Sequence, residues 1–266
     1  METSDFFADI HCHLLPGVDD GARSWDEALE MARIAHADGI RAVIATPHQL
    51  GAYAHNTGDM LRMKTAKLQL QLQSEGIELQ VLPGADVRIE PELVPRLLQG
   101  EVLTLADQRR HVLLELPHDL YFPLEKLVDR LLGHGIVAIL SHPERNQGLL
   151  RQRHRLSGLV ERGCLMQVTA GSFSGSFGNV CQQMADWMLG QRLVHFIATD
   201  AHGPHVRRPL MQRAFDYVSE RHGVDLARLL CGENPRAVCD GRQVACPSPV
   251  VKSRGLGVWF GWRKAA

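Results

Sequence analysis

The stretch that decides the fold is FADIHCHLLPGVDDGA, residues 7–22. It reads as a β-strand over Phe7–His11 that runs into His13 and then into a loop with two aspartates and a glycine. Alternate residues of a strand point to the same side, so His11 and His13 can bind one metal ion together. The stretch therefore predicts a strand that ends in metal-ligating side chains.

Six further apolar runs have strand character, and amphipathic stretches of helical character follow most of them. The other predicted strands are 41–46, 79–82, 112–116, 137–141, 165–169 and 194–199. The predicted helices are 24–37, 57–74, 123–132, 149–161, 179–189 and 207–221. Such alternation is typical of parallel strands with helical crossovers, and continuous apolar strands indicate a sheet covered on both faces. We predict an α/β barrel related to the (β/α)₈ type with about seven units; an open doubly wound sheet is the alternative.

The composition disfavours several classes of protein. The 266 residues carry a formal net charge of −1, so a nucleic-acid binder driven by a basic surface is disfavoured. No apolar run approaches a membrane span and the first residues do not resemble a signal peptide, so we expect a cytoplasmic protein with reduced cysteines. We expect one domain over residues 1–245. A basic, aromatic tail follows over 246–266, either a loosely packed terminus or a contact with a partner or a membrane surface.

Six of the seven predicted strands end in His, Asp or Glu. The candidate metal ligands at or after these ends are His11, His13, Asp20, His48, Asp86, Glu115, His142, Asp200 and His202. Glu115 lies within an apolar run, where a buried carboxylate needs a cation. Imidazole and carboxylate ligands suit Mn, Fe or Zn. Nine ligands are too many for one ion and predict two or three, an arrangement typical of metal-assisted hydrolysis.

Two arginines indicate the substrate class. Arg145 and Arg207 each follow a ligand-bearing strand end, and guanidinium groups bind phosphate oxygens. Together with a metal cluster they predict hydrolysis of a phosphoryl ester. The sequence contains no P-loop, no G-x-S-x-G and no Cys-x₅-Arg motif, so water is favoured over a side chain as the nucleophile.

These motifs resemble those of a known family. The stretches are Asp9–His13, Asp19–Gly21, Thr46–His48, Gly84–Asp86, His142–Arg145 and Thr199–His202, with HCHLLPGVDDGA at residues 11–22 and Asn234–Arg236 near the end. They are similar to the PHP (polymerase and histidinol phosphatase) superfamily, and within it to the bacterial manganese-dependent tyrosine-protein phosphatases of capsule and exopolysaccharide loci. The resemblance runs from about Asp9 to Val238.

The resemblance implies a distorted TIM-like (β/α)₇ barrel, the PHP fold, with three divalent ions, Mn²⁺ in the first place and Fe or Zn as alternatives. One ion would be held by His11, His13, Asp86 and Asp200, a second by Asp86, Glu115 and His142, and a third by Asp20, His48 and His202. Arg145 and Arg207 would bind phosphate, and Asp200 is the third catalytic residue we expect. A metal-bridging hydroxide would attack phosphorus in line. Asp86 departs from the glutamate that the family usually has there.

The resemblance also implies a partner: a phosphotyrosine protein, in the first place a membrane tyrosine autokinase. The sequence leaves a homo-oligomer open. The main alternative activity is hydrolysis of a small phosphomonoester such as histidinol phosphate or a sugar phosphate. An amidohydrolase barrel is disfavoured because the fourth strand offers Glu115 and no lysine, and a PHP-type nuclease because of the net charge. A regulator without metal is disfavoured because an empty site would bury unpaired charges.

Overall fold

The computed structural model describes residues 6–245. The strands are β1 (Phe7–Cys12), β2 (Ile40–Ala45), β3 (His48–Gln49), β4 (Gln80–Pro83), β5 (Asp86–Arg88), β6 (His111–Glu115), β7 (Val137–Ser141), β8 (Leu165–Thr169) and β9 (Phe196–Ala198). The α-helices are α1 (Trp25–Ala37), α2 (Gly58–Ser74), α3 (Leu93–Gln99), α4 (Glu125–Gly133), α5 (Gln147–Arg151), α6 (Arg155–Glu161), α7 (Ala170–Phe173), α8 (Asn179–Gly190), α9 (Gln212–His222), α10 (Val224–Arg228) and α11 (Asn234–Cys239). Short turns of other helix types are η1 (Leu105–Asp107), η2 (Pro143–Arg145) and η3 (Leu229–Glu233).

All ladders between these strands are parallel, and together they form a distorted barrel. The sheet is split into β1-β2-β4 and β3-β5-β6-β7-β8-β9. The split arises because β2 and β4 each break and continue, after a gap of two residues, as β3 and β5. The two sheets meet again where β1 lies beside β9, through the bridge Cys12–Ala201. The predicted seven-strand barrel is confirmed, with two of its strands interrupted.

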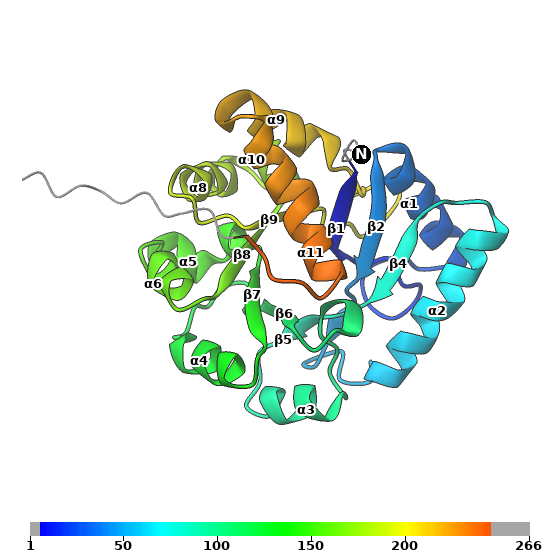
Figure 1. Ribbon diagram of the computed structural model, residues 1–266, viewed down its shortest axis with the longest axis horizontal. Helices are drawn as coiled ribbons and strands as arrows, with labels where there is room; N and C mark the ends of the chain where they lie inside the picture. The colour runs from blue at the N-terminus through cyan, green and yellow to red at the C-terminus, as the bar shows by residue number, and fades with distance from the viewer. Residues whose placement is uncertain (1–5, 246–266) are drawn as a thin grey trace, which may run out of the picture.

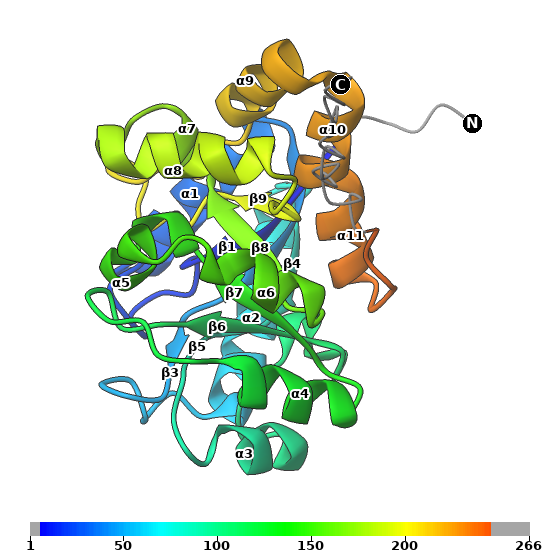
Figure 2. The same ribbon diagram turned by 90° about the vertical axis from the view of Figure 1, so that its left-hand side faces the viewer.

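Both faces of the strands are buried, as the apolar runs predicted. The interior of the barrel contains the apolar cluster Ala8, Ile10, Ala42, Ile44, Leu113, Ile139, Leu165, Phe196 and Ala198. The outward residues pack under the helices that surround the barrel in Figure 1. Helix α11 lies across one end of the barrel and adds Ala237, Val238 and Cys239 to the interior cluster, as Figure 2 shows from the side. This end is therefore closed by apolar packing.

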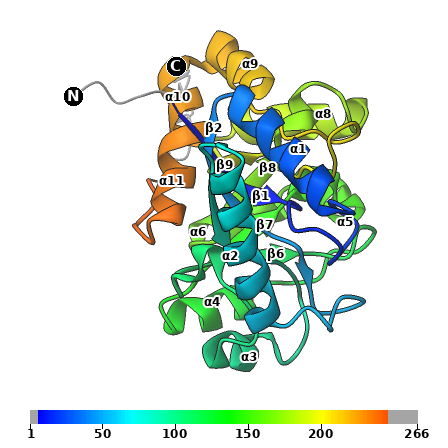
Figure 3. The ribbon, with the colours of Figure 1, turned by 90° about the vertical axis from the view of Figure 1, so that its right-hand side faces the viewer.

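The chain begins and ends its helices largely where the sequence predicted. The Ser24 side chain accepts the N–H of Glu27 at the start of α1, and Gly39 follows the end of α1 with φ +94°. Figure 3 shows α1 and α2 side by side on the outer face. Two helix predictions were wrong in extent. The stretch 149–161 is broken into α5 and α6, and the stretch 207–221 becomes helical only at Gln212.

The physical reason for the second error is the loop that precedes α9. Arg207 has φ +51°, outside the helical region, and its carbonyl accepts the N–H of His202. The backbone N–H of Gln212 then donates to Asp38 at 2.9 Å, which helps to start α9. The loop is therefore a defined structure that holds Arg207 in place.

The five cysteines within residues 6–245 are buried, and none forms a disulfide. No helix in this part of the chain combines the length and apolar character that crossing a bilayer requires. The basic tail predicted over 246–266 lies outside the described residues.

Candidate metal centre

The end of the barrel opposite α11 gathers the charged side chains. Beyond the carboxyl end of β1, the Nε2 atoms of His11 and His13 are 3.3 Å apart, so the two rings converge as the strand alternation predicted. His11 Nε2 lies 3.3 Å from Asp200 and 3.5 Å from Asp86. All four side chains are almost fully buried. Carboxylates and imidazoles from β1, β5 and the end of β9 therefore face one point.

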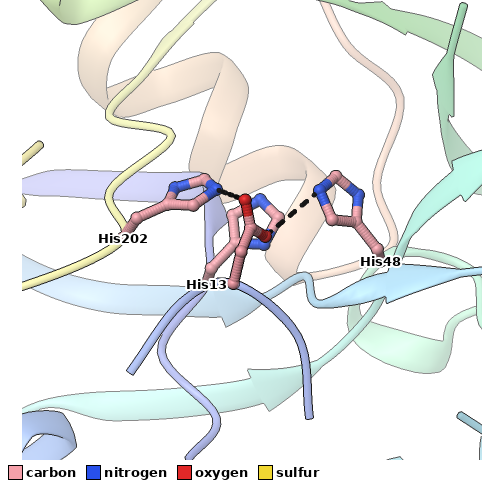
Figure 4. A group of neighbouring side chains, drawn as sticks. His13, His48 and His202 are labelled. Carbon is pink, nitrogen blue, oxygen red and sulfur yellow. Dashed lines mark ion pairs between the residues drawn. The ribbon is translucent and has the colours of Figure 1, made fainter. Parts of the chain in front are cut away.

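A second group lies beside the first and nearer the surface. His48 and His202 approach Asp20 at 3.5 and 3.6 Å, and the ring of His13 lies 3.8 Å from that of His202 between centroids. Figure 4 shows the three imidazoles facing one another, with dashed lines for the two ion pairs. Asp20 reaches this position from the loop after β1, as the order Asp-Asp-Gly in the sequence allowed.

The third group joins the ends of the second to fifth barrel strands. His48 Nδ1 lies 3.6 Å from both Asp86 and Glu115. His48 is close to Asp86 because the two residues are partners in the β3–β5 ladder. His142 approaches the same two carboxylates at 3.9 and 4.0 Å. Asp86 is thus the carboxylate shared by the first and third groups.

The structure brings together all nine candidate ligands. Within the described residues, the side-chain clusters with metal-binding geometry consist of these nine and no other residue. The clusters are His13, Asp20, His48 and His202; His11, His142 and Asp200; His11, His13 and Asp86; and His48, Asp86 and Glu115. Which residues share an ion stays a prediction.

Asp19 is a residue of the site that the sequence analysis did not select as a ligand. Its carboxylate binds His13 Nδ1 at 2.7 Å and accepts the backbone N–H groups of Gly21 and His48. This bond leaves His13 Nε2 facing the cluster. Burial alone would lower the pKa of His13, but Asp19 and Asp200 raise it to about 10. Asp19 holds the proton on Nδ1, and the proton on Nε2, which faces Asp200, marks the place where a cation would bind.

Gln167 orients the ring of His11 as Asp19 orients that of His13, and the sequence analysis did not select Gln167 either. Its Oε1 accepts the backbone N–H of His142 and lies 2.9 Å from His11 Nδ1. Because an amide oxygen only accepts, Nδ1 carries the ring proton and the lone pair of Nε2 faces Asp86 and Asp200. A glutamine inside the apolar strand LMQVT was the available sequence signal, analogous to Glu115 in its own strand.

The two candidate phosphate-binding arginines also reach the site. Arg145 and Arg207 both form ion pairs with Asp200 Oδ2. The ring of Phe177 lies under both guanidinium groups, 4.2 Å from Arg145 and 5.8 Å from Arg207. Phe177 belongs to the loop after α7 and was not predicted. The aromatic face and Asp200 together fix two cations at the edge of the ligand cluster.

Three residues of the site have a strained backbone. His142, Asp200 and Arg207 have φ of +32°, +50° and +51°, a region that non-glycine residues rarely adopt. Such conformations cost about 1–3 kcal/mol each and persist where the surroundings enforce them. All three residues are among the predicted site residues, so the fold of the surrounding chain enforces these conformations at the site.

The donor set fits divalent cations. Neither carboxylate oxygen of Asp86 has a hydrogen-bond partner, although the residue is buried. Burial and the charge of Glu115 raise the pKa of Asp86 well above its usual range, so without a cation the group would take up a proton. Burial lowers the pKa of His48 and His202 to about 4 and of His142 to about 3. These imidazoles are thus neutral at pH 7, as metal ligands must be.

Fold and site together define a metal-dependent hydrolase on a distorted α/β barrel. The model of the family "Capsular polysaccharide synthesis, CpsB/CapC" matches residues 7–240. The chain belongs to this CpsB/CapC family, which has a PHP-like fold, and the predicted family is confirmed.

Similar proteins agree with this assignment. The tyrosine-protein phosphatase YwqE of Bacillus subtilis is 34% identical over 94% of this chain and 98% of its own length. The tyrosine-protein phosphatase CpsB of Streptococcus pneumoniae is 25% identical over 86% and 97%. A crystal structure from work on YwqE and CpsB, described as metal-dependent tyrosine phosphatases, superposes with a TM-score of 0.86 over 91% of this chain and 99% of the other, at 34% identity. A lactonase of Listeria monocytogenes, at a TM-score of 0.52 and 12% identity over 88% and 94%, shares the fold alone.

Proposed function

We propose that this protein is a metal-dependent phosphatase that hydrolyses phosphotyrosine in a protein of capsule or exopolysaccharide synthesis. The observation that carries the proposal is the position of Arg145 and Arg207 beside the nine converging ligands. Metal ligands alone are compatible with many hydrolases. Two fixed guanidinium groups at the edge of the cluster add the recognition of a phosphoryl group.

The ligand groups would hold three divalent ions, with Mn²⁺ proposed first. His11, His13, Asp86 and Asp200 would hold one ion; Asp86, Glu115 and His142 the second; Asp20, His48 and His202 the third. When bound, the ions would supply a water of lowered pKa and neutralise charge on the phosphoryl oxygens. The shorter Asp86 remains a carboxylate shared between ligand groups, as its distances to His11, His48 and His142 allow.

The residues of the chain bind and orient the substrate. Arg145 and Arg207 would donate hydrogen bonds to the phosphate oxygens, and Phe177 would hold both guanidinium planes. Burial opposes ionisation of Asp200, but His11, His13, His142 and Arg207 together hold its pKa well below the usual range. Asp200 is therefore an anion that positions the arginines, and it does not act as a proton donor to the leaving phenolate.

The partner proposed for this site is a phosphotyrosine protein, in the first place a membrane tyrosine autokinase, met on the cytoplasmic side. A free phosphotyrosine side chain must reach the ligand cluster, and His48, Glu115 and His142 are only partly buried there. Two further contacts are proposed: one made by the tail over 246–266, and one between copies of this chain in a homo-oligomer. Both are to be tested in the same assays.

The decisive experiment compares phosphate release from a phosphotyrosine peptide and from histidinol phosphate, after chelation and with Mn²⁺ added back. We expect manganese-dependent release that favours the peptide. Preference for histidinol phosphate would move the function to small-molecule metabolism. No release from either substrate, with metal demonstrably bound, would overturn the phosphatase assignment.

The role of the arginines is tested separately with Arg207→Ala. If Arg207 binds phosphate in the ground state, KM for an aryl phosphate rises more than kcat falls. Arg110→Ala is the matched control, because Arg110 is exposed and precedes β6 at the far end of the barrel. Unchanged kinetic constants in Arg207→Ala would remove this residue from the site.

A further inference from the structure

A second hollow adjoins the metal centre on the side of Arg207. It is a pocket of about 330 Å³ between the loop after β8 and the loop after β9. Thr199, directly before Asp200, lies at its inner wall, and Phe177 and Arg207 form the boundary with the site. Both loops follow the carboxyl ends of their strands, so the pocket opens on the same face of the barrel as the metal centre.

The charge of this pocket differs from that of the protein as a whole. Arg207, Arg208, Arg213 and His205 line it, and no lining residue is acidic. The whole chain has a net charge of −1, so this is a local concentration of positive charge. Arg207 is engaged by Asp200, but no ion pair joins the side chains of Arg208 or Arg213 to any residue of the described range 6–245.

Part of the remaining wall is apolar. Val206 and Leu210 contribute side chains that are 76% and 37% exposed, and Ala170 and Ala214 form part of the floor. Exposed apolar side chains beside unpaired guanidinium groups suit a ligand with an aliphatic stem and a carboxylate end. A glutamate side chain has this composition, and an aspartate side chain is a shorter version of it.

We propose that this pocket is a subsite for an acidic residue that flanks the phosphotyrosine in the substrate. The inference rests on the proposed function and names its preferred substrate class: phosphotyrosine in an acidic sequence. An extended peptide advances about 3.3–3.6 Å per residue, so the pocket beside Arg207 is within reach of the first three positions next to the phosphotyrosine. Arg208 and Arg213 would attract the carboxylate, while Val206 and Leu210 would contact its stem.

The backbone holds the subsite in place. His202 N donates to Arg207 O, so the basic loop is tied to a residue of the ligand cluster. Gln182 donates its side-chain amide to Phe173 O at 2.8 Å and supports the start of the loop with Phe177. A preorganised pocket of this kind loses little conformational entropy when a peptide binds.

The test uses phosphotyrosine peptides that differ only in the flanking positions: glutamate, glutamine or lysine, before or after the phosphotyrosine. We expect kcat/KM for the glutamate peptide to exceed that for the glutamine peptide by roughly fivefold, as for one exposed charge pair, and the ratio to fall with added salt. The peptide with the larger effect reveals the direction in which the chain lies.

The variant Arg208→Glu/Arg213→Glu should reverse the order, so that the lysine peptide becomes the better substrate. An aryl phosphate without flanking residues should be hydrolysed by this variant as by the parent protein, because neither arginine touches the ligand cluster. Arg110→Glu/Arg130→Glu matches the change in net charge away from the pocket and should keep the preference for glutamate. An equal preference in parent and variant would overturn the subsite.

The two proposals fail in distinguishable ways. If no phosphotyrosine substrate is hydrolysed, with or without flanking acid, the proposed function fails. If the peptides and the aryl phosphate are hydrolysed but the flanking residue has no effect, the phosphatase stands and the acidic subsite is wrong.

Discussion

The two ends of the barrel are built on opposite principles. At the amino end of the strands, α11 closes the interior by packing Ala237 and Val238 against the apolar cluster of the barrel. At the carboxyl end, Asp86 is buried without a hydrogen-bond partner and Asp200 has a strained backbone. The apolar packing at the first end stabilises the fold. The second end destabilises it, because its buried ligands do not satisfy one another's hydrogen-bonding groups.

Asn234 is a buried polar residue at the end of the barrel that α11 closes. Its side-chain amide donates to His195 O at 3.0 Å and to Ala245 O at 2.9 Å, and its Oδ1 accepts the N–H of Ala245. The residue is buried, yet each polar atom has a partner. Asp86 differs from Asn234 in this respect, because neither of its buried carboxylate oxygens has a hydrogen-bond partner.

The largest expected effect comes from Asp86→Asn. Losing a shared ligand should lower kcat/KM for a phosphotyrosine peptide by about 10⁴-fold. Without metal, the variant should melt at the same temperature as the parent protein or higher, because a buried carboxyl without a partner has been removed. Mn²⁺ should raise the melting temperature of the parent far more than that of the variant.

Asp86→Glu is the control, because it keeps a carboxylate and restores the residue that the resemblance implies at this position. It should retain manganese-dependent activity. Full activity in Asp86→Asn would break the comparison, since the missing partner would then have no connection with function.

The next effect belongs to the opposite end. Phe196 is fully buried in the barrel interior, and Phe196→Ala should lower the free energy of unfolding by roughly 4 kcal/mol. The folded fraction should keep its kcat, because Phe196 is not among the ligand clusters. Denaturant unfolding and activity below the transition measure the two quantities. A loss of kcat as severe as that of Asp86→Asn would show that the two ends are not separable.

The smallest effect concerns pH. His195 lies directly before β9, and burial lowers its pKa to about 4, against about 6.5 in the unfolded chain. Between these values the unfolded chain binds the extra proton, so this residue makes the fold less stable as the pH falls from 6.5 towards 4.

The measurement compares the parent with His195→Gln, which keeps an acceptor for the N–H of Met166 but does not titrate. From pH 7 to 4.5 the parent should lose roughly 2.5 kcal/mol more of its unfolding free energy than the variant. The site carboxyls and imidazoles titrate in both proteins and cancel in the difference. Parallel pH profiles would mean that His195 does not contribute to the acid sensitivity of the closed end.

Much of the barrel and of the ligand cluster was predictable, because the carboxyl ends of parallel strands lie at one face. Seven strands were expected and found, and nine side chains that lie as much as 191 positions apart in the sequence meet at one end. The convergence of His11 and His13 followed from strand alternation alone. These features depend on local pattern and on topology, which the sequence carries directly.

Other features depend on contacts that no local pattern specifies. Asp19 and Asp20 are adjacent and chemically identical, yet Asp19 is buried against His13 while Asp20 faces His48 and His202. Only the path of the loop separates their roles. The strands β3 and β5, which continue β2 and β4, were missed because His-Gln and Asp-Val-Arg are too short and too polar to show a strand pattern.

The seam between β1 and β9 has a consequence for the order of folding. Asp9 accepts the backbone N–H of Thr199 across 190 positions, and His13 N donates to Ala201 O. The first and last barrel strands to be synthesised are thus neighbours, and contacts of such high sequence separation form slowly. Asp200 and His202 leave the ribosome long after the histidines they meet. The assembled metal centre therefore exists only in a nearly full-length chain, so a nascent or truncated fragment cannot act as a phosphatase before the barrel closes.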